Sequence, residues 1–134
     1  MRPSSIATFE RVVLLMLILM AASTAISWDG VEAAARAQRV EGSAVAITLG
    51  VLLVLFLALV WLVSRRGSNA ARWIYVLIVG AALVYQAIHI GEISGPTTGW
   101  LMAAAEAVLA LLSIWLLLRP DSNAWFSRGR SPSA

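Results

Sequence analysis

The chain has 134 residues, of which 60% are hydrophobic and only 13% are charged. Soluble domains average about 45–50% apolar and about 25% charged residues, so these few charges cannot solvate a globular surface of this size. The composition argues against a soluble enzyme, a disordered chain and a nucleic-acid-binding protein, and it indicates an integral membrane protein with the lipid bilayer as its first partner.

The chain contains no cysteine, and its only histidine is His89. A disulfide, a thiolate metal site and an iron–sulfur cluster are therefore excluded, and we expect neither a metal nor a cofactor. The sequence pI of 10.6 does not indicate nucleic acid, because the arginines stand at the ends of apolar runs and form no basic stripe. A chain without lysine that is rich in Arg, Ala and Gly suggests a bacterial genome of high GC content.

Four apolar stretches follow one another along the chain, at residues 12–28, 42–64, 73–91 and 97–118. Each is long enough to cross a hydrocarbon core of roughly 30 Å as a helix, which takes about 20 residues. In lipid the backbone must satisfy its own hydrogen bonds, so such runs are helices rather than strands. The sequence therefore predicts an all-α fold, a four-helix transmembrane bundle that forms a single membrane domain over residues 1–134.

The first stretch also has features of a signal peptide, but its uncharged run is long and its cleavage site poor, so we expect it to be retained. After it, Asp29 and Glu32 have the spacing of a capping box for a short interfacial helix over Gly30–Val40. Glu32 and Arg36 can pair at i, i+4. The turn at Gly91–Pro96 is short, so the last three spans are expected to pack as antiparallel neighbours.

Arginine counting predicts the orientation. Eight arginines fall on the side of the two termini and two on the other side, so the positive-inside rule places both termini in the cytoplasm, here of a bacterial inner membrane. Residues 119–134 are then a cytoplasmic tail, with a short interfacial helix followed by disorder. The tryptophans near span ends are expected to anchor the bundle at the interface: Trp61, Trp73, Trp115 and Trp125.

The pattern W-L-x-x-R-x-x-S-N-A occurs at residues 61–70 and again at 115–124. Each copy ends a span at the predicted cytoplasmic face, where Trp anchors, Arg stops the span and a serine or aspartate caps the next helix. A duplicated hairpin and convergence of two membrane exits both explain this 54-residue echo.

The stretches R-G-S-N-A-A-R-W (66–73) and R-P-D-S-N-A-W-F (119–126) resemble the membrane exits of small four-span bacterial membrane proteins of unknown function. The resemblance covers these two segments only. The resemblance implies the same topology and indicates no biochemical activity.

Glu106 lies near the middle of the last span, where a charge costs about 2.5–3.5 kcal/mol on insertion scales. Ionisable residues inside the membrane are functional candidates by default. Small residues at helical spacing, a packing ridge, are expected to turn Glu106 toward another helix: Gly99, Ala103, Ala107 and Ala110.

The expected partners of Glu106 are Gln86 and His89, one turn apart on the third span, so we predict a polar seam in the outer half of the bundle and a dry inner half. Two interpretations stay open. In one, Glu106 is a proton or cation site below an outward-facing vestibule. In the other, it is a neutral residue that donates one hydrogen bond between helices.

No nucleophile–base pair, phosphate loop or paired-acid motif occurs, so we expect no enzyme. The sequence favours a small accessory or assembly subunit that acts through helix packing, with itself or with another membrane protein. The alternative is a proton-coupled small-molecule carrier or channel, oligomeric and dependent on Glu106.

Overall fold

The computed structural model describes residues 3–89 and 97–127, apart from the side chains of residues 97 and 98, and this part of the chain is helical and contains no strand. Its elements are α1 (Ser4–Ile26), α2 (Trp28–Ala37), α3 (Gly42–Arg66), α4 (Asn69–Ile88), α5 (Thr97–Leu118) and α6 (Pro120–Ser127). Four of them, α1, α3, α4 and α5, are long and apolar enough to cross a membrane. This confirms the all-α class of the described residues and the expectation of four helices that are long and apolar enough to span a membrane. The turn expected at Gly91–Pro96 and the end of the tail lie outside the described residues.

The helix bounds differ from the expected spans mainly at the start of α1 and α4. α1 already begins at Ser4 and so contains the charged pair Glu10 and Arg11. α4 begins at Asn69, because the Ser68 hydroxyl caps its first turn by accepting a hydrogen bond from the backbone N–H of Ala71 at 3.2 Å. Both helices therefore begin before their apolar stretch and include charged residues near their N-termini.

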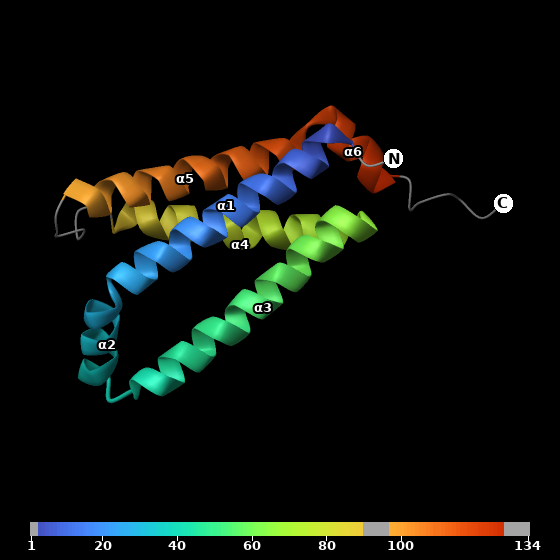
Figure 1. Ribbon diagram of the computed structural model, residues 1–134. Helices are drawn as coiled ribbons and strands as arrows, with labels where there is room; N and C mark the ends of the chain where they lie inside the picture. Colours follow the sequence, from blue (N-terminus) through green and yellow to red (C-terminus); the bar gives the residue numbers. More distant parts are fainter. Residues whose placement is uncertain (1–2, 90–96, 128–134) are drawn as a thin grey trace.

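The four long helices run up and down between two ends of the bundle (Figure 1). We call one the α6 end: there α1 and α4 begin, and α3 and α5 end. At the other, the α2 end, the short helix α2 joins α1 to α3. The most extensive contact is between α1 and α5, while α4 packs against both α3 and α5. The predicted contacts of the last three spans are thus present, but the first span forms the main pair with the last.

The buried core lies toward the α6 end. α3 contributes to it only near its own C-terminus, through Val60, Val63 and Ser64, and then diverges from the other helices toward α2 (Figure 1). An apolar helix can remain unpacked in this way because lipid tails are as apolar as its side chains. The hydrophobic core consists of Ile6, Phe9, Val13, Met16, Leu17, Val60, Val63, Ala71, Tyr75, Val79, Ala110, Leu116, Leu117 and Phe126.

α2 forms where a short interfacial helix was expected, and Glu32 pairs with Arg36 at 2.8 Å as predicted. The predicted cap is wrong. Asp29 lies inside the first turn of α2, and the residue at the N-cap, Ser27, makes no side-chain capping bond. An acidic residue in the first turn still favours the helix, because it faces the positive end of the helix dipole.

The two copies of the 54-residue echo fold differently. In the first copy, Gly67 adopts a left-handed conformation with φ of 60° and ends α3, and Ser68 then caps α4. In the second copy, Pro120 is already the first residue of α6, and the aligned Ser122 lies inside that helix. A proline at the first helical position has its φ preset for a helix, so α6 begins without the intervening left-handed residue.

Candidate functional site

Glu106 lies near the middle of α5 and is partly buried. Its Oε1 atom is fully buried and has no hydrogen-bond partner within the described chain. Neither of the expected partners, Gln86 and His89, donates a hydrogen bond to it, and both bond to backbone carbonyls instead. An intramembrane carboxyl group without a partner is unusual, because polar groups inside the membrane ordinarily pair with one another or with backbone carbonyls.

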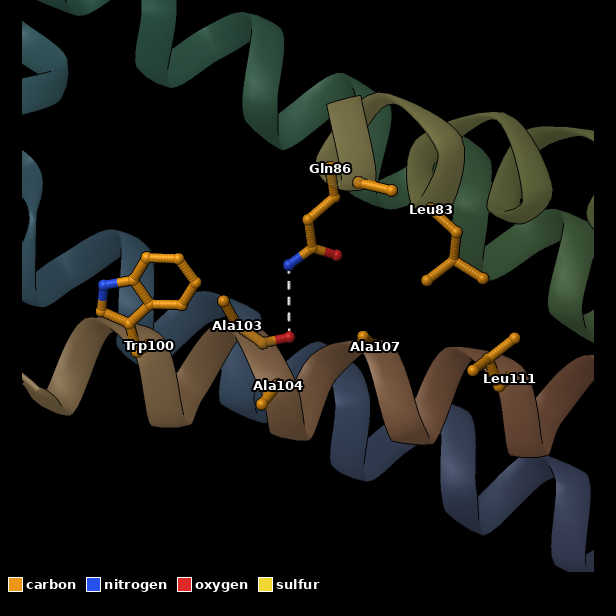
Figure 2. Close-up of a pocket in the computed structure, with 8 residues that line it drawn as sticks. Leu83, Gln86, Trp100, Ala103, Ala104, Ala107 and Leu111 are labelled. Carbon is orange, nitrogen blue, oxygen red and sulfur yellow. Dashed lines mark hydrogen bonds between the residues drawn. The ribbon is translucent and has the colours of Figure 1, made fainter. Parts of the chain in front are cut away.

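Gln86 instead links α4 to α5 through the backbone. Its side-chain Nε2 donates to the carbonyl oxygen of Ala103 at 3.2 Å, and this bond crosses the space between the two helices (Figure 2). The carbonyl of Ala103 lies in the interior of α5, so it accepts this bond in addition to its helical one. Gln86 therefore joins α4 to the backbone of α5 and does not bond to Glu106.

A cavity of about 340 Å³ lies between α4 and α5 beside this bond. Its lining is almost entirely apolar, with Gln86 as the polar member, and Glu106 does not contribute to it. Figure 2 shows Trp100 at one end and Leu111 at the other, with small residues of α5 between them. The residues that line it are Leu83, Gln86, Ala87, Trp100, Ala103, Ala104, Ala107 and Leu111. We call this space the α4–α5 groove.

The small-residue ridge of α5 is only partly covered by the chain itself. Ala110 is buried in the core, while Ala103 and Ala107 line the α4–α5 groove. Gly99 is exposed, and no atom of the described chain lies within 4 Å of the position that a Cβ would occupy there. The ridge therefore packs toward the α6 end and opens toward the α2 end.

His89 ends α4 and interacts with its own helix. Its ring stacks on Tyr85 with centroids 4.1 Å apart, and Nδ1 lies 2.9 Å from the Tyr85 carbonyl oxygen. The stacking matches the i, i+4 spacing of the two residues. The three residues expected to form one polar site, Glu106, Gln86 and His89, make no hydrogen bond with one another. In residues 3–89 and 97–127, no three metal-ligating side chains come together.

The hydrogen bonds between helices are concentrated at the α6 end. This end lies beside the two termini and is the half of the bundle that was expected to be dry, so that prediction was wrong. The hydroxyl of Tyr75 in α4 donates to Ser113 in α5 at 2.8 Å, and Ser113 in turn donates to the Ala110 carbonyl at 2.7 Å. Both hydroxyl-bearing residues are fully buried. The Tyr75 ring also makes an edge-on contact with Phe9 of α1, so one residue connects three helices.

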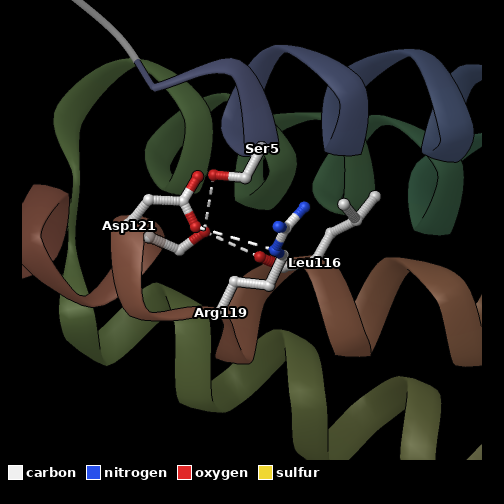
Figure 3. A network of polar contacts seen from close by, with 5 residues as sticks. Ser5, Leu116, Arg119 and Asp121 are labelled. Atoms are coloured by element: carbon white, nitrogen blue, oxygen red, sulfur yellow. Dashed lines mark hydrogen bonds and ion pairs between the residues drawn. The ribbon is translucent and has the colours of Figure 1, made fainter.

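A second polar cluster joins α1, α5 and α6 (Figure 3). Ser5 and Ser122 are both buried, and their hydroxyl oxygens lie 2.9 Å apart. Ser122 donates its proton to the Leu116 carbonyl at 2.7 Å, which is one of the last carbonyls of α5 and has no acceptor role inside that helix. Ser122 therefore caps the end of α5 from within α6.

Asp121 completes this cluster beside Arg119, whose Nε lies 3.9 Å from Oδ1 of the carboxylate. A hydrogen bond from the Ser5 side chain, together with backbone N–H groups and the Arg119 charge, holds the pKa of Asp121 below its ordinary range. The Ser5 hydroxyl has a single proton, and the Ser122 oxygen and the Asp121 carboxylate compete for it. The start of α1 is thus tied to the turn between α5 and α6.

The four expected anchor tryptophans do not have the same environment. Trp61, Trp73 and Trp115 are about half exposed near helix ends, in the manner of interface residues. Trp125 packs inward instead, with its buried Nε1 3.0 Å from the position of a Cβ on Gly67. α6 is therefore held against the turn between α3 and α4.

The sequence interpretation missed Tyr75, Ser113, Ser5 and Ser122, which carry the hydrogen bonds between helices. A signal was present in each case, because a hydroxyl group within or beside an apolar span needs a partner that lipid cannot supply. The interpretation also missed Arg72, the one charged side chain that is buried in the described part of the chain.

No protein-family model, no curated protein and no solved structure matches the chain. The site must therefore be interpreted from its own geometry.

Proposed function

We propose that this protein is a non-enzymatic accessory or assembly subunit, which packs the α4–α5 groove against a transmembrane segment of another membrane protein. The observation that carries the proposal is the apolar cavity of about 340 Å³, with Ala103, Ala104 and Ala107 on one wall. Small residues let the backbone of a second helix approach closely, and they are enriched where membrane helices associate.

Gly99 supports the same assignment, because it extends the small face of α5 toward the α2 end and no described side chain covers it. The polar residue at the groove, Gln86, already donates one N–H to the Ala103 carbonyl, so a partner has to satisfy only the rest of its amide group. Trp100, at the end of the groove, offers a large apolar surface against which a side chain of the partner can pack.

We further propose that the protein is multi-pass in a bacterial cytoplasmic membrane with both termini inside. The support is the distribution of arginine: Arg65, Arg66 and Arg119 lie at the α6 end, whereas Arg36 and Arg39 follow α1 at the α2 end. The positive-inside rule assigns the richer end to the cytoplasm. Kinship with the four-span bacterial proteins that share the two exit motifs belongs to the same proposal.

The test is site-specific crosslinking in native membranes. A photoreactive residue at Ala107 should give one discrete adduct with a transmembrane peptide of another protein, whereas the same residue at Ala82, exposed on α4 and outside the α4–α5 groove, should not. Ala104→Leu fills the groove and should abolish the adduct, while Ala82→Leu should leave it unchanged. Adducts with lipid alone, or with a second copy of this chain alone, would contradict a subunit that binds another protein.

A second function is favoured by one observation, the buried and unpaired Oε1 of Glu106. We propose as the alternative a proton-coupled carrier or channel, built as a homo-oligomer, in which Glu106 exchanges protons with water. A hydrophobic carbodiimide modifies protonated carboxyl groups, so labelling of Glu106 should fade with rising pH between about 6 and 8 if it is a working proton site. Glu106→Gln is the control, and absence of labelling at every pH would contradict this alternative.

A further inference from the structure

Arg72 stands one turn into α4, at the α6 end, and only 6% of its surface is exposed. Its Nε is fully buried and has no hydrogen-bond partner within the described chain. In residues 3–89 and 97–127, no carboxylate lies within the 4.0 Å of an ion pair with Arg72, in contrast to Arg36, Arg65 and Arg119. A guanidinium nitrogen that is removed from water and left without an acceptor is unfavourable.

Two aromatic rings offset part of this cost. The central carbon of the Arg72 guanidinium lies 5.1 Å from the ring centroid of Phe126 and 5.5 Å from that of Trp73. Such contacts attract a cation through the faces of the rings, but they supply no hydrogen-bond acceptor. The N–H groups of the guanidinium therefore still need an acceptor, and arginine is suited to one that offers two oxygens.

The position of Arg72 in the helix is a second reason why its positive charge is unfavourable there. The N-terminus of α4 carries the positive end of its dipole, so a cation one turn in is unfavourable and an anion would be favourable. Ser68 accepts a hydrogen bond from one N–H of this turn, from Ala71. Arg66, at the end of α3, lies over Trp61 and has no carboxylate within ion-pair distance among the described residues, so it adds to the positive potential of the same turn.

The level of Arg72 in the membrane indicates the anion. The turn at Gly67 separates two spanning helices, and Trp73 is half exposed directly beside Arg72. Tryptophan concentrates at the level of the lipid headgroups, where phosphate is the abundant anion. A phosphate offers two oxygens to one guanidinium, in the bidentate arrangement for which arginine is suited.

We propose that Arg72, which lies over the rings of Phe126 and Trp73 at the N-terminus of α4, binds the phosphate of an anionic phospholipid headgroup. The site is at the opposite end of the bundle from the opening of the α4–α5 groove at Gly99. It is independent of the proposed function, and either proposal can fail while the other holds.

The test is native mass spectrometry of the detergent-solubilised full chain with phosphatidylglycerol added. The wild type should retain one phosphatidylglycerol in preference to phosphatidylcholine. Arg72→Gln should weaken this retention by about tenfold or more, which is the effect of losing one charge-assisted hydrogen bond. Arg11→Gln is the matched control, because it removes the same charge from an exposed position on α1 and should leave retention unchanged.

Two further variants guard against loss of the fold. Arg72→Met keeps the apolar stem without the charge and should lose the lipid as Arg72→Gln does, whereas Arg72→Lys keeps the charge without the bidentate geometry and should retain more lipid than either uncharged variant. The helical circular dichroism of each variant is recorded in lipid-free detergent. Equal retention by wild type and both uncharged variants would overturn the proposal. Displacement of the lipid by millimolar inorganic phosphate would overturn the assignment to a lipid and identify free phosphate as the ligand.

Discussion

The hydroxyl groups of Ser5 and Ser122, 117 residues apart in the chain, lie 2.9 Å from each other in the buried contact between α1 and α6. This bond and the Ser122 bond to Leu116 fasten the first helix, the last spanning helix and the terminal helix at one end of the bundle.

The two serines should not be equivalent. Ser122→Ala strands the buried Leu116 carbonyl and leaves Ser5 only the Asp121 carboxylate as an acceptor, so we expect it to destabilise the bundle by about 1–3 kcal/mol. Ser5→Ala leaves Ser122 bonded to Leu116 and should cost about 0.5–1.5 kcal/mol. Unfolding by denaturant in detergent measures both values. Ser127→Ala, on the exposed face of α6, is the control and should have little effect. A larger loss from Ser5→Ala than from Ser122→Ala would contradict this order.

Tyr75→Phe should reduce the free energy of unfolding by about 0.6 kcal/mol, the average for hydrogen bonds between membrane helices, and by no more than about 1.7 kcal/mol, the maximum. The ring contact with Phe9 is kept, so the loss reports the bond to Ser113 alone. Tyr85→Phe is the matched control, since Tyr85 is exposed and stacks on His89 through its ring. Equal unfolding curves for the two variants would show that the hydroxyl of Tyr75 contributes nothing.

Gly67→Ala should destabilise the protein by about 1–2 kcal/mol, because a left-handed φ is strained for any residue with a Cβ. The new Cβ would also lie 3.0 Å from Nε1 of Trp125 and push α6 away. Gly80→Ala, inside α4 with no atom within 4 Å of its Cβ position, should instead be neutral or stabilising. Hydrogen exchange of α6 checks the displacement, and it should speed up in Gly67→Ala alone.

The packing of α6 against the rest of the bundle should depend on pH through Asp121. Its pKa is held below the ordinary range by the Ser5 hydrogen bond, by backbone N–H groups and by Arg119, so the folded state favours the carboxylate. The stabilisation is therefore complete at neutral pH and is lost as the pH falls below about 4. Hydrogen exchange of α6 between neutral pH and about pH 3 measures this loss after correction for the intrinsic exchange rate. Asp121→Asn should abolish the acid step, and Asp29→Asn on α2 should not. A step of the same size in Asp121→Asn would assign it to another group.

Features that depend on neighbours in the chain could be predicted from the residues alone. The four spanning helices follow from long apolar runs, because a backbone in lipid must close its hydrogen bonds within the segment. The pairing of Glu32 with Arg36 and the stacking of Tyr85 on His89 follow from helical spacing. The cap of α4 by Ser68 follows from the same local rules.

The tertiary structure decided which polar groups meet. Apolar runs contain no information about the rotation of one helix against another in lipid, where no hydrophobic force selects a face. Only packing could therefore bring Tyr75 to Ser113, turn Gln86 to the Ala103 carbonyl rather than to Glu106, and place Arg72 over the ring of Phe126. The composition specified a membrane bundle, and side-chain packing at the α6 end specified its arrangement.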